Sequence, residues 1–534
     1  MPTNLERNVM YIEPNTVIRI LHNCPLDKTY DHTIYFGSEN AQISYFQGLT
    51  KYTFTEQTYQ RVQRGKARVQ RKAEDLYDCN YMMFQNSSFG NKWFYAFITS
   101  VEYVNNITSE ISFEIDVMQT WFFDYNLEEC FVEREHSVTD NIGDNLVPEN
   151  LELGDYFIRY KRGTNLFGST LNDWCYMVVA SFDKNGNDAV GKQYQGVYSG
   201  LVYNFFENYT QINDFLEQYA QKAQTGVVTI LQIPKFMYED YSLNPNAPVR
   251  HTIDLGAMPT TIGDYTPKNK KLLTYPYNFL YVTNYNGNSA TYKYEYFYYN
   301  NPLGGEETTN PTFDIVAGLN TNPTFVCIPR GYKAQKNVGI SNIDNPDEKL
   351  TLSGLPHCAY NVDAFKAWLA QNSSSLAVNA LSSAMSWGIA AGSVTGGAGA
   401  AAGATAGLIN SVASSLSQVY QASIRPPQAN GEQGSITNVN VGLFDFGFYF
   451  KQIRPEFARI IDDYFNMYGY ATHRVKTPNR TSRPYWNFVK TIGCVVTGSI
   501  PADDMYKICE IYDRGITFWK NGDNVGNYSL DNRP

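Results

Sequence analysis

The chain has 534 residues, of which 43% are hydrophobic and 18% are charged. This length exceeds that of one domain of about 100–200 residues, so we expect several domains with sizeable cores, and the composition excludes a disordered chain. The formal net charge of −10 argues against tight binding to nucleic acid, which needs clustered lysine and arginine.

The first 135 residues read as β-strands. Residues 16–21, 92–99 and 110–117 are rich in β-branched and aromatic residues, and the last of these alternates apolar and polar side chains. The basic stretch 61–72 is interpreted as a solvated surface segment. The 42 tyrosines and 31 phenylalanines of the chain also favour strands.

The middle region, 137–365, mixes strands with turn signals such as Asn185-Gly186, Asn286-Gly287 and Gly304-Gly305. Residues 209–223 are predicted to be helical. The tract 292–299 is dominated by tyrosine, and we interpret it as sheet surface because little positive charge surrounds it in the sequence.

Residues 367–424 contain no charged side chain, which is the most informative feature of the chain. Apolar residues recur at helical spacing on both sides of a glycine-rich centre, and glycines recur every fourth residue, as in helices that pack closely in lipid. The apolar set is Leu381, Met385, Ile389, Ile409, Val412, Leu416 and Val419, and the glycines are Gly388, Gly392, Gly396, Gly399, Gly403 and Gly407.

Three interpretations of this segment stay open on the residues alone: a linker, a hairpin of buried helices, and a membrane segment that is sheltered until needed. Each arm of roughly 26 residues is about 39 Å long if helical, enough to cross a bilayer core of about 30 Å. Asn372, Asn379, Asn410 and many serines make it too polar for a permanent transmembrane helix.

Strand-like aromatic runs return after Pro426-Pro427, at residues 443–450, 488–497 and 516–519. A helix is predicted over residues 455–468, with one apolar face. That face consists of Phe457, Ile460, Ile461, Tyr464 and Phe465.

Searches for catalytic motifs find no phosphate-binding loop, H-E-x-x-H zinc motif or G-x-S-x-G elbow. His136 is interpreted as a lone surface histidine, His357-Cys358 as structural residues, and Asp503-Asp504 as a helix N-cap. The eight cysteines form no C-x-x-C pair, and residues 1–14 contain no signal-peptide-like apolar stretch. We expect no enzyme activity, no metal and no cofactor, and synthesis in the cytoplasm.

Both chain ends carry strings that resemble a known family. The N-terminal strings are MFQN at 83–86, GNKWFYAF at 90–97, FEIDVMQTW at 113–121 and REH at 134–136. The C-terminal strings are YGY at 468–470, RV at 474–475, PN at 478–479, and DRGITFW at 513–519 followed by Asn524 and GNYS at 526–529. They are similar to the tail knob, or distal tail tube, proteins of small protein-primed short-tailed phages of the Salasmaviridae type.

The resemblance implies a mainly β (α+β) subunit whose β-barrel domains form a hexameric ring at the distal end of the tail in the virion. It implies that the glycine-rich loop plugs the tube, then enters the host cell membrane and opens a path for genome ejection. The implied partners are further copies of the chain, the upper tail tube or collar protein, the host membrane, and phage DNA in transit.

On this basis we expect an N-terminal tube domain at 1–136, an inserted β-rich region at 137–365, the loop at 366–430 and a C-terminal tube domain at 431–534. The alternative is a receptor-binding adsorption protein whose tyrosine-rich middle region contacts glycan. A wall hydrolase is a third hypothesis, but it needs an acid/base or Cys/His site that the sequence does not show.

Overall fold

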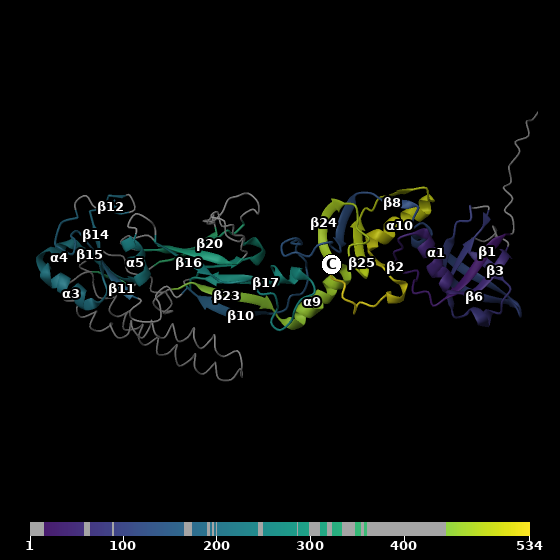
Figure 1. Cartoon of the computed structure of the whole chain (residues 1–534), viewed down its shortest axis with the longest axis horizontal. Helices are drawn as coiled ribbons and strands as arrows, with labels where there is room; N and C mark the ends of the chain where they lie inside the picture. The colour runs from purple at the N-terminus through teal and green to yellow at the C-terminus, as the bar shows by residue number, and fades with distance from the viewer. Residues whose placement is uncertain are drawn as a thin grey trace, which may run out of the picture. The chain divides into compact units, whose positions relative to one another are not determined.

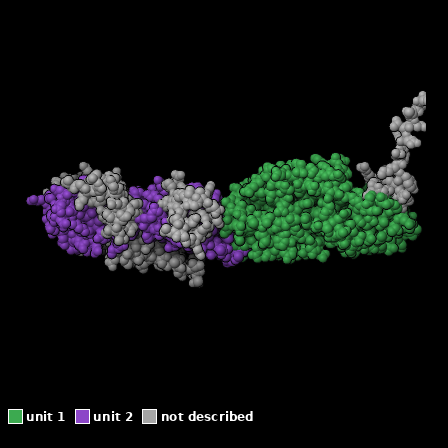
Figure 2. All heavy atoms as spheres, turned by 45° about the horizontal axis from the view of Figure 1, so that its top comes forward, with its two compact units in different colours: residues 1–152, 267–271, 459–534 green, residues 153–266, 272–458 purple. Residues whose placement is uncertain are grey.

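The computed structural model describes residues 15–57, 65–87, 90–164, 174–189, 193–194, 197–198, 200–243, 249–285, 287–297, 310–317, 323–333, 348–353, 357–359 and 445–534. The described part is mainly β, as expected (Figure 1). It divides into unit 1, residues 1–152, 267–271 and 459–534, and unit 2, residues 153–266 and 272–458 (Figure 2). The expected domain boundaries at 136, 365 and 430 stay predictions.

Unit 1 begins with a six-stranded antiparallel sheet, here called the N-terminal sheet. Its strands, in spatial order, are β3 (Thr50–Gln57), β1 (Thr16–His22), β5 (Cys79–Gln85), β6 (Phe94–Asn105), β7 (Thr108–Ile115) and β4 (Lys66–Val69). Ile20, Met82 and Val69 belong to one buried cluster although they come from the second, third and last strands in this order, which means that the sheet curls over its own apolar face.

The basic segment 61–72 was expected to be a solvated surface segment, and its described residues, 65–72, are exposed or partly exposed apart from Val69. Its second half forms β4, the edge strand of the N-terminal sheet. Lys66 and Arg68 each pair with Glu110 on β7, with N–O distances of 2.8 Å. Residues 61–64 lie outside the described residues.

The second sheet of unit 1, here called the mixed sheet, combines the two ends of the chain. Its order is β2 (His32–Ile34), β27 (Ile516–Trp519), β25 (Trp486–Ile492), β9 (Cys130–Glu135) and β24 (Tyr470–Lys476), and only β2 and β27 are parallel. The shorter elements of unit 1 are β8 (Tyr125–Leu127), β26 (Val496–Gly498), α1 (Glu39–Gly48), α2 (Val117–Thr120), α10 (Ala502–Arg514), η1 (Ala73–Leu76) and η7 (Gly522–Asn524).

Helix α9 (Pro455–Tyr468) has the predicted bounds, and its first residue is a proline, which is favoured at that position. Ile461 and Phe465 are buried as expected, but Ile460 is 67% exposed. The assignment of Ile460 to the buried face was therefore wrong. The apolar stripe of this helix is narrower than the sequence pattern indicated.

Unit 2 contains three four-stranded sheets. The β10 sheet has the strand order β10 (Tyr156–Gly163), β23 (Gly447–Ile453), β17 (Asn278–Thr283) and β18 (Ser289–Tyr292). The β11 sheet has the order β14 (Val202–Phe206), β11 (Trp174–Ala180), β15 (Val227–Pro234) and β22 (His357–Ala359). The β16 sheet has the order β16 (Val249–Asp254), β19 (Thr312–Ala317), β20 (Phe325–Arg330) and β21 (Leu350–Leu352). All three sheets contribute to one core, for example through Phe450, Met177 and Phe313.

The remaining elements of unit 2 include a helical stretch that was predicted at 209–223. It is found as two helices, α3 (Tyr209–Gln218) and α4 (Ala220–Gly226). The others are β12 (Gln193–Tyr194), β13 (Val197–Tyr198), α5 (Lys235–Leu243) and η5 (Tyr294–Tyr296), while η4 (Lys270–Leu273) crosses the boundary between the units.

The tyrosine-rich tract that begins at residue 292 was expected to be sheet surface, and this was wrong for Tyr292, Tyr294 and Phe297, whereas the residues between them are partly exposed. Tyr292 and Tyr294 are fully buried in the core of unit 2, together with Phe297. The tract leaves the sheet after Tyr292 and turns through η5, so period-2 alternation no longer decides which side chains face water.

Gly469, between α9 and β24, lies against the backbone of the mixed sheet with no room for a side chain. Its φ is +64°, and a Cβ there would lie 2.6 Å from His136 N and closer still to Glu135 O. We expect Gly469→Ala to lower the thermal midpoint of unit 1 by more than Gly493→Ala, the matched control with φ +66° and no atom within 4 Å. The control carries only backbone strain of about 1–2 kcal/mol. Equal losses in scanning calorimetry would contradict this packing.

Candidate functional site

The residues predicted to form the membrane-active loop lie outside the described residues. They are Leu381, Met385, Gly388, Ile389, Gly392, Gly396, Gly399, Gly403, Gly407, Ile409, Val412 and Leu416. Within the described ranges, no helix combines the length and the apolar character that a membrane span needs. The loop assignment therefore stays a prediction.

Unit 1 contains a buried group of charges, here called the ionic cluster: Arg134, Glu149 and Lys271. Glu149 Oε1 lies 2.7 Å from Lys271 Nζ, and Oε2 pairs with Arg134. The three side chains are only 3–10% exposed. One carboxylate thus serves two cations, which come from segments more than 100 residues apart in the chain.

The surroundings of Lys271 in this cluster shift its pKa. Burial, followed by the charge of the neighbouring Arg134 guanidinium, lowers the pKa of Lys271. Lys271 Nζ also donates to the Val147 carbonyl at 2.8 Å. Loss of Glu149 would leave two buried cations without their shared counter-ion.

Two further carboxylates hold the segment 267–271 by its backbone. Asp462 accepts the amides of Lys268 at 2.6 Å and Asn269 at 2.9 Å. Asp140 accepts the Lys270 amide at 2.9 Å and the Tyr470 hydroxyl at 2.6 Å. The sequence reasoning missed this arrangement, because nothing along the chain links the basic run 268–271 to partners that are about 120–200 residues away in sequence.

His136 was interpreted as a surface histidine, and this was wrong. It is buried, its Nδ1 accepts the Phe488 amide at 2.7 Å, and its protonated Nε2 donates to the Asn466 carbonyl at 3.1 Å. Burial, followed by the charge of Arg483, lowers its pKa to about 3. His136 is therefore a neutral residue that joins β9, β25 and α9.

The other sequence-based candidates also find structural explanations. Asp503 and Asp504 do not cap α10, because Pro501 occupies the N-cap position; they lie in the first turn, where Asp504 accepts the Trp121 indole N–H at 2.8 Å. His357 and Cys358 lie on β22, and their side chains are outside the described set. Among the described residues, no group of His, Cys, Asp and Glu could hold a metal.

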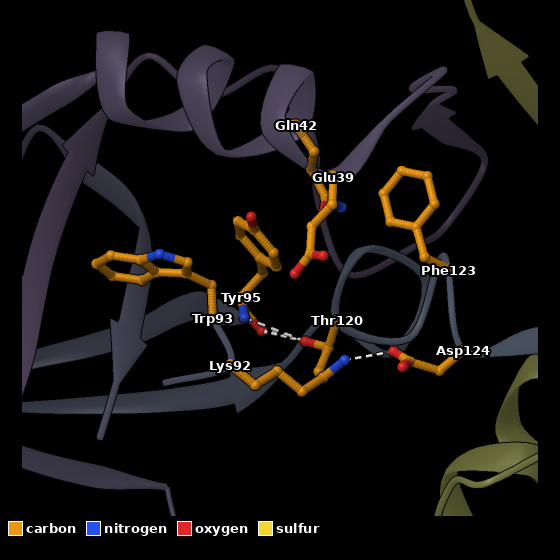
Figure 3. Close-up of a pocket in the computed structure, with 8 residues that line it drawn as sticks. All are labelled: Glu39, Gln42, Lys92, Trp93, Tyr95, Thr120, Phe123 and Asp124. Atoms are coloured by element: carbon orange, nitrogen blue, oxygen red, sulfur yellow. Dashed lines mark hydrogen bonds and ion pairs between the residues drawn. The ribbon is translucent and has the colours of Figure 1, made fainter. Parts of the chain in front are cut away.

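A small cavity lies between α1, the start of β6 and α2 (Figure 3). Its volume is about 30 Å³, against about 300–1,000 Å³ for a typical ligand pocket. The Lys92–Asp124 ion pair closes one side. The cavity has room for water but not for a substrate, so we place no chemistry in it.

Two surfaces of unit 1 have the character of assembly sites. β3 and β4 are the outermost strands of the N-terminal sheet, and edge strands offer backbone groups for pairing with another chain. On the mixed sheet, Phe131 lies opposite both Val475 and Ile492. These three side chains, here called the apolar row, are 37%, 69% and 56% exposed.

Comparison with known families places most of this chain among phage tail proteins. Residues 244–533, more than half of the chain, match the family described as "Bacillus phage phi29, Tail knob protein gp9, C-terminal domain". Residues 14–126 match the family "Caudoviral major tail protein N-terminus".

Individual relatives match along nearly the whole length. Tail knob protein gp9 of Bacillus phage phi29 is 28% identical over an alignment of 606 positions, covering 97% of this chain and 98% of that protein. Tail knob protein gp9 of Bacillus phage B103 is 27% identical with the same coverage. The solved tail knob protein gp12 of bacteriophage C1 shares the fold, with a TM-score of 0.64 at 16% identity over 97% of this chain and 99% of that one.

We expect Glu149→Gln to destabilise unit 1 strongly, because it leaves Arg134 and Lys271 buried without a counter-charge. Breaking a buried pair in this way costs about 3–5 kcal/mol. Asp124→Asn, which breaks the more exposed pair with Lys92, is the control and should cost less than about 1 kcal/mol. Urea unfolding followed by tryptophan fluorescence measures both, and a Glu149→Gln cost no larger than that of the control would contradict the role of the cluster.

His136 predicts a defined pH dependence of stability. Its folded pKa of about 3 lies below the unfolded value of 6.5, so the unfolded state binds more protons between these values and stability falls as the pH drops below 6.5. At pH 5 the loss is about 2 kcal/mol. His136→Gln keeps a donor and an acceptor but does not titrate, so the difference in thermal midpoint between wild type and variant should shrink from pH 7.5 to pH 5. A constant difference would rule out this contribution.

Proposed function

The chain belongs to the phi29 gp9 tail knob family, and from that premise we propose that its copies form the distal tube through which a short-tailed phage ejects its genome. It is a structural component of the virion tail. The proposal adds that six copies close into a ring, that the loop 366–430 plugs the bore before infection, and that the same loop then enters the host membrane.

The observation that carries the penetration role is the absence of charge over residues 367–424. Burying such segments together inside a ring removes apolar surface from water at about 25 cal/mol per Å². Lipid offers an equivalent apolar environment, so the plug can leave the tube at little cost. Glycines at four-residue intervals let the arms pack closely in either place.

The tube role is supported by features of unit 1. Its N-terminal sheet ends in two edge strands, and a closed ring would cover such edges. The chain is acidic overall, with a net charge of −10, so its surface gives transiting DNA little to bind. The upper tail tube or collar protein would adjoin this ring.

The alternative, adsorption to glycan through the tyrosine-rich middle region, has less support at residues 292–297. Tyr292, Tyr294 and Phe297 are core residues, so their rings do not form a platform for sugar. A soluble chain that bound purified cell walls would revive this alternative.

We expect the intact protein to release dye from liposomes at low pH, and a variant lacking residues 372–422 to release none. A single Ile389→Asp change in the apolar stripe should reduce leakage strongly, because an aspartate at the centre of a membrane helix costs about 2.5–3.5 kcal/mol. Ser383→Asp, on the polar side of the same predicted arm, is the matched control and should reduce it less. Full leakage from the deletion variant would refute the penetration role.

A further inference from the structure

Unit 1 holds two neighbouring cations, Arg480 and Lys520, outside the ionic cluster. Both side chains are partly exposed. Other lysines of unit 1 pair with carboxylates, for example Lys51 with Asp78 and Lys507 with Glu114. Within the described ranges, by contrast, neither Arg480 nor Lys520 forms an ion pair, although aspartate and glutamate outnumber lysine and arginine in this chain by 52 to 42.

The mixed sheet fixes the position of Lys520. In the parallel pair of β2 and β27, Ile34 lies opposite Trp519, and Tyr35 and Lys520 come directly after them. The Tyr35 amide donates to the Trp519 carbonyl at 2.8 Å, and the Lys520 amide donates to the Tyr485 carbonyl at 2.9 Å. Lys520 Nζ lies 4.4 Å from the ring centroid of Tyr35. The lysine is therefore held at the carboxyl end of two paired strands.

Arg480 reaches the same place from the connection between β24 and β25. The preceding residue is anchored, because the Asn479 amide donates to Glu135 Oε2 at 3.1 Å. The guanidinium carbon lies near three ring centroids, those of Phe122 at 5.3 Å, Tyr125 at 5.6 Å and Tyr35 at 6.0 Å. The guanidinium also hydrogen-bonds the Tyr125 hydroxyl. Arg480 and Lys520 thus approach the same ring, that of Tyr35.

The aromatic rings explain why each cation is tolerated here, but they do not balance the two charges. A ring face attracts a cation and has no net charge, so it leaves the repulsion between Arg480 and Lys520 in place. Burial, followed by the charge of Arg480, lowers the pKa of Lys520 to about 8. Arg480 Nη1 is buried and has no hydrogen-bond partner. Among the described residues, the pair therefore lacks both a counter-charge and an acceptor.

We propose that Arg480 and Lys520 bind a phosphate dianion, either inorganic phosphate or a phosphomonoester. A guanidinium offers a planar fork of N–H donors and an ammonium offers a compact charge, and proteins use both to hold phosphate. A phosphomonoester carries about −1.5 to −2 charges at pH 7, which matches two cations. A small anion can reach both side chains from solvent, because both are partly exposed.

A carboxylate of a second copy is the competing occupant, because the chain is acidic overall. A single carboxylate would neutralise only one of the two charges, and a phosphodiester, as in a nucleic-acid backbone, also carries only one. The charge match therefore favours the dianion. Such binding is independent of the proposed ring, since both cations belong to unit 1 of one copy.

The test titrates the full-length protein with inorganic phosphate at pH 7 in isothermal titration calorimetry, with ionic strength held constant by sodium chloride. Lys520→Gln should weaken phosphate binding about tenfold or more, because it removes one charge-assisted contact. Lys520→Arg keeps the charge and should retain most of the affinity. Glycerol 3-phosphate, titrated in parallel, shows whether the site accepts a monoester as well as the free anion.

Lys92→Gln is the matched control. Lys92 Nζ also lies over an aromatic ring, 4.7 Å from the centroid of Trp121, but it is paired with Asp124. This variant should bind phosphate like wild type. Circular dichroism should confirm that each variant is folded, and the Lys520 variants decide the result if Arg480→Gln, which loses contacts with three rings, does not fold.

Three outcomes would overturn the proposal. The first is no binding of millimolar phosphate by the folded wild type, or binding that Lys520→Gln leaves unchanged. The second is equal affinity for dimethyl phosphate, a diester with a single charge, which would contradict the assignment to a dianion. The third is self-association in sedimentation velocity that Lys520→Gln weakens and Lys92→Gln does not, without phosphate binding, which would assign the cations to a carboxylate of a second copy.

Discussion

Burial of Glu149 between Arg134 and Lys271 is the interaction on which unit 1 depends, because it joins segments that the chain order keeps apart. The Glu149 carboxylate accepts hydrogen bonds from Arg134 on β9, from Lys271 and from the Ala471 amide on β24, so it joins all three segments. Removing one partner from such a cluster lowers stability strongly, whereas the intact cluster adds little stability over an apolar core. Its main contribution is therefore to specify one arrangement of these segments.

The ionic cluster explains how three separate stretches of the chain form one compact unit. Unit 1 is assembled from three stretches, and the mixed sheet pairs β2 near the start with β27 near the end. His136, bonded to Phe488 and Asn466, is a second fixed point of the same kind.

Unit 1 presents surfaces that suit contact with other chains. Among its described residues, the outermost strands β3 and β4 offer backbone groups, and the apolar row of Phe131, Val475 and Ile492 is exposed. The relatives of this chain are tail knob proteins, and such surfaces fit a structural subunit of a virion tail.

The sequence by itself determined the mainly β character, the bounds of α9 and the charge-free segment, because these follow from local periodicity and composition. The strings at the two chain ends also determined the family. Only the tertiary structure decided that His136 is buried, that Ile460 is exposed and that Tyr292 is core. His136 is buried by contacts with Phe488 and Asn466, more than 300 positions away, and Tyr292 by contacts with Phe313 and Tyr332 on other elements. Such contacts between separate elements set protonation and exposure regardless of the local pattern.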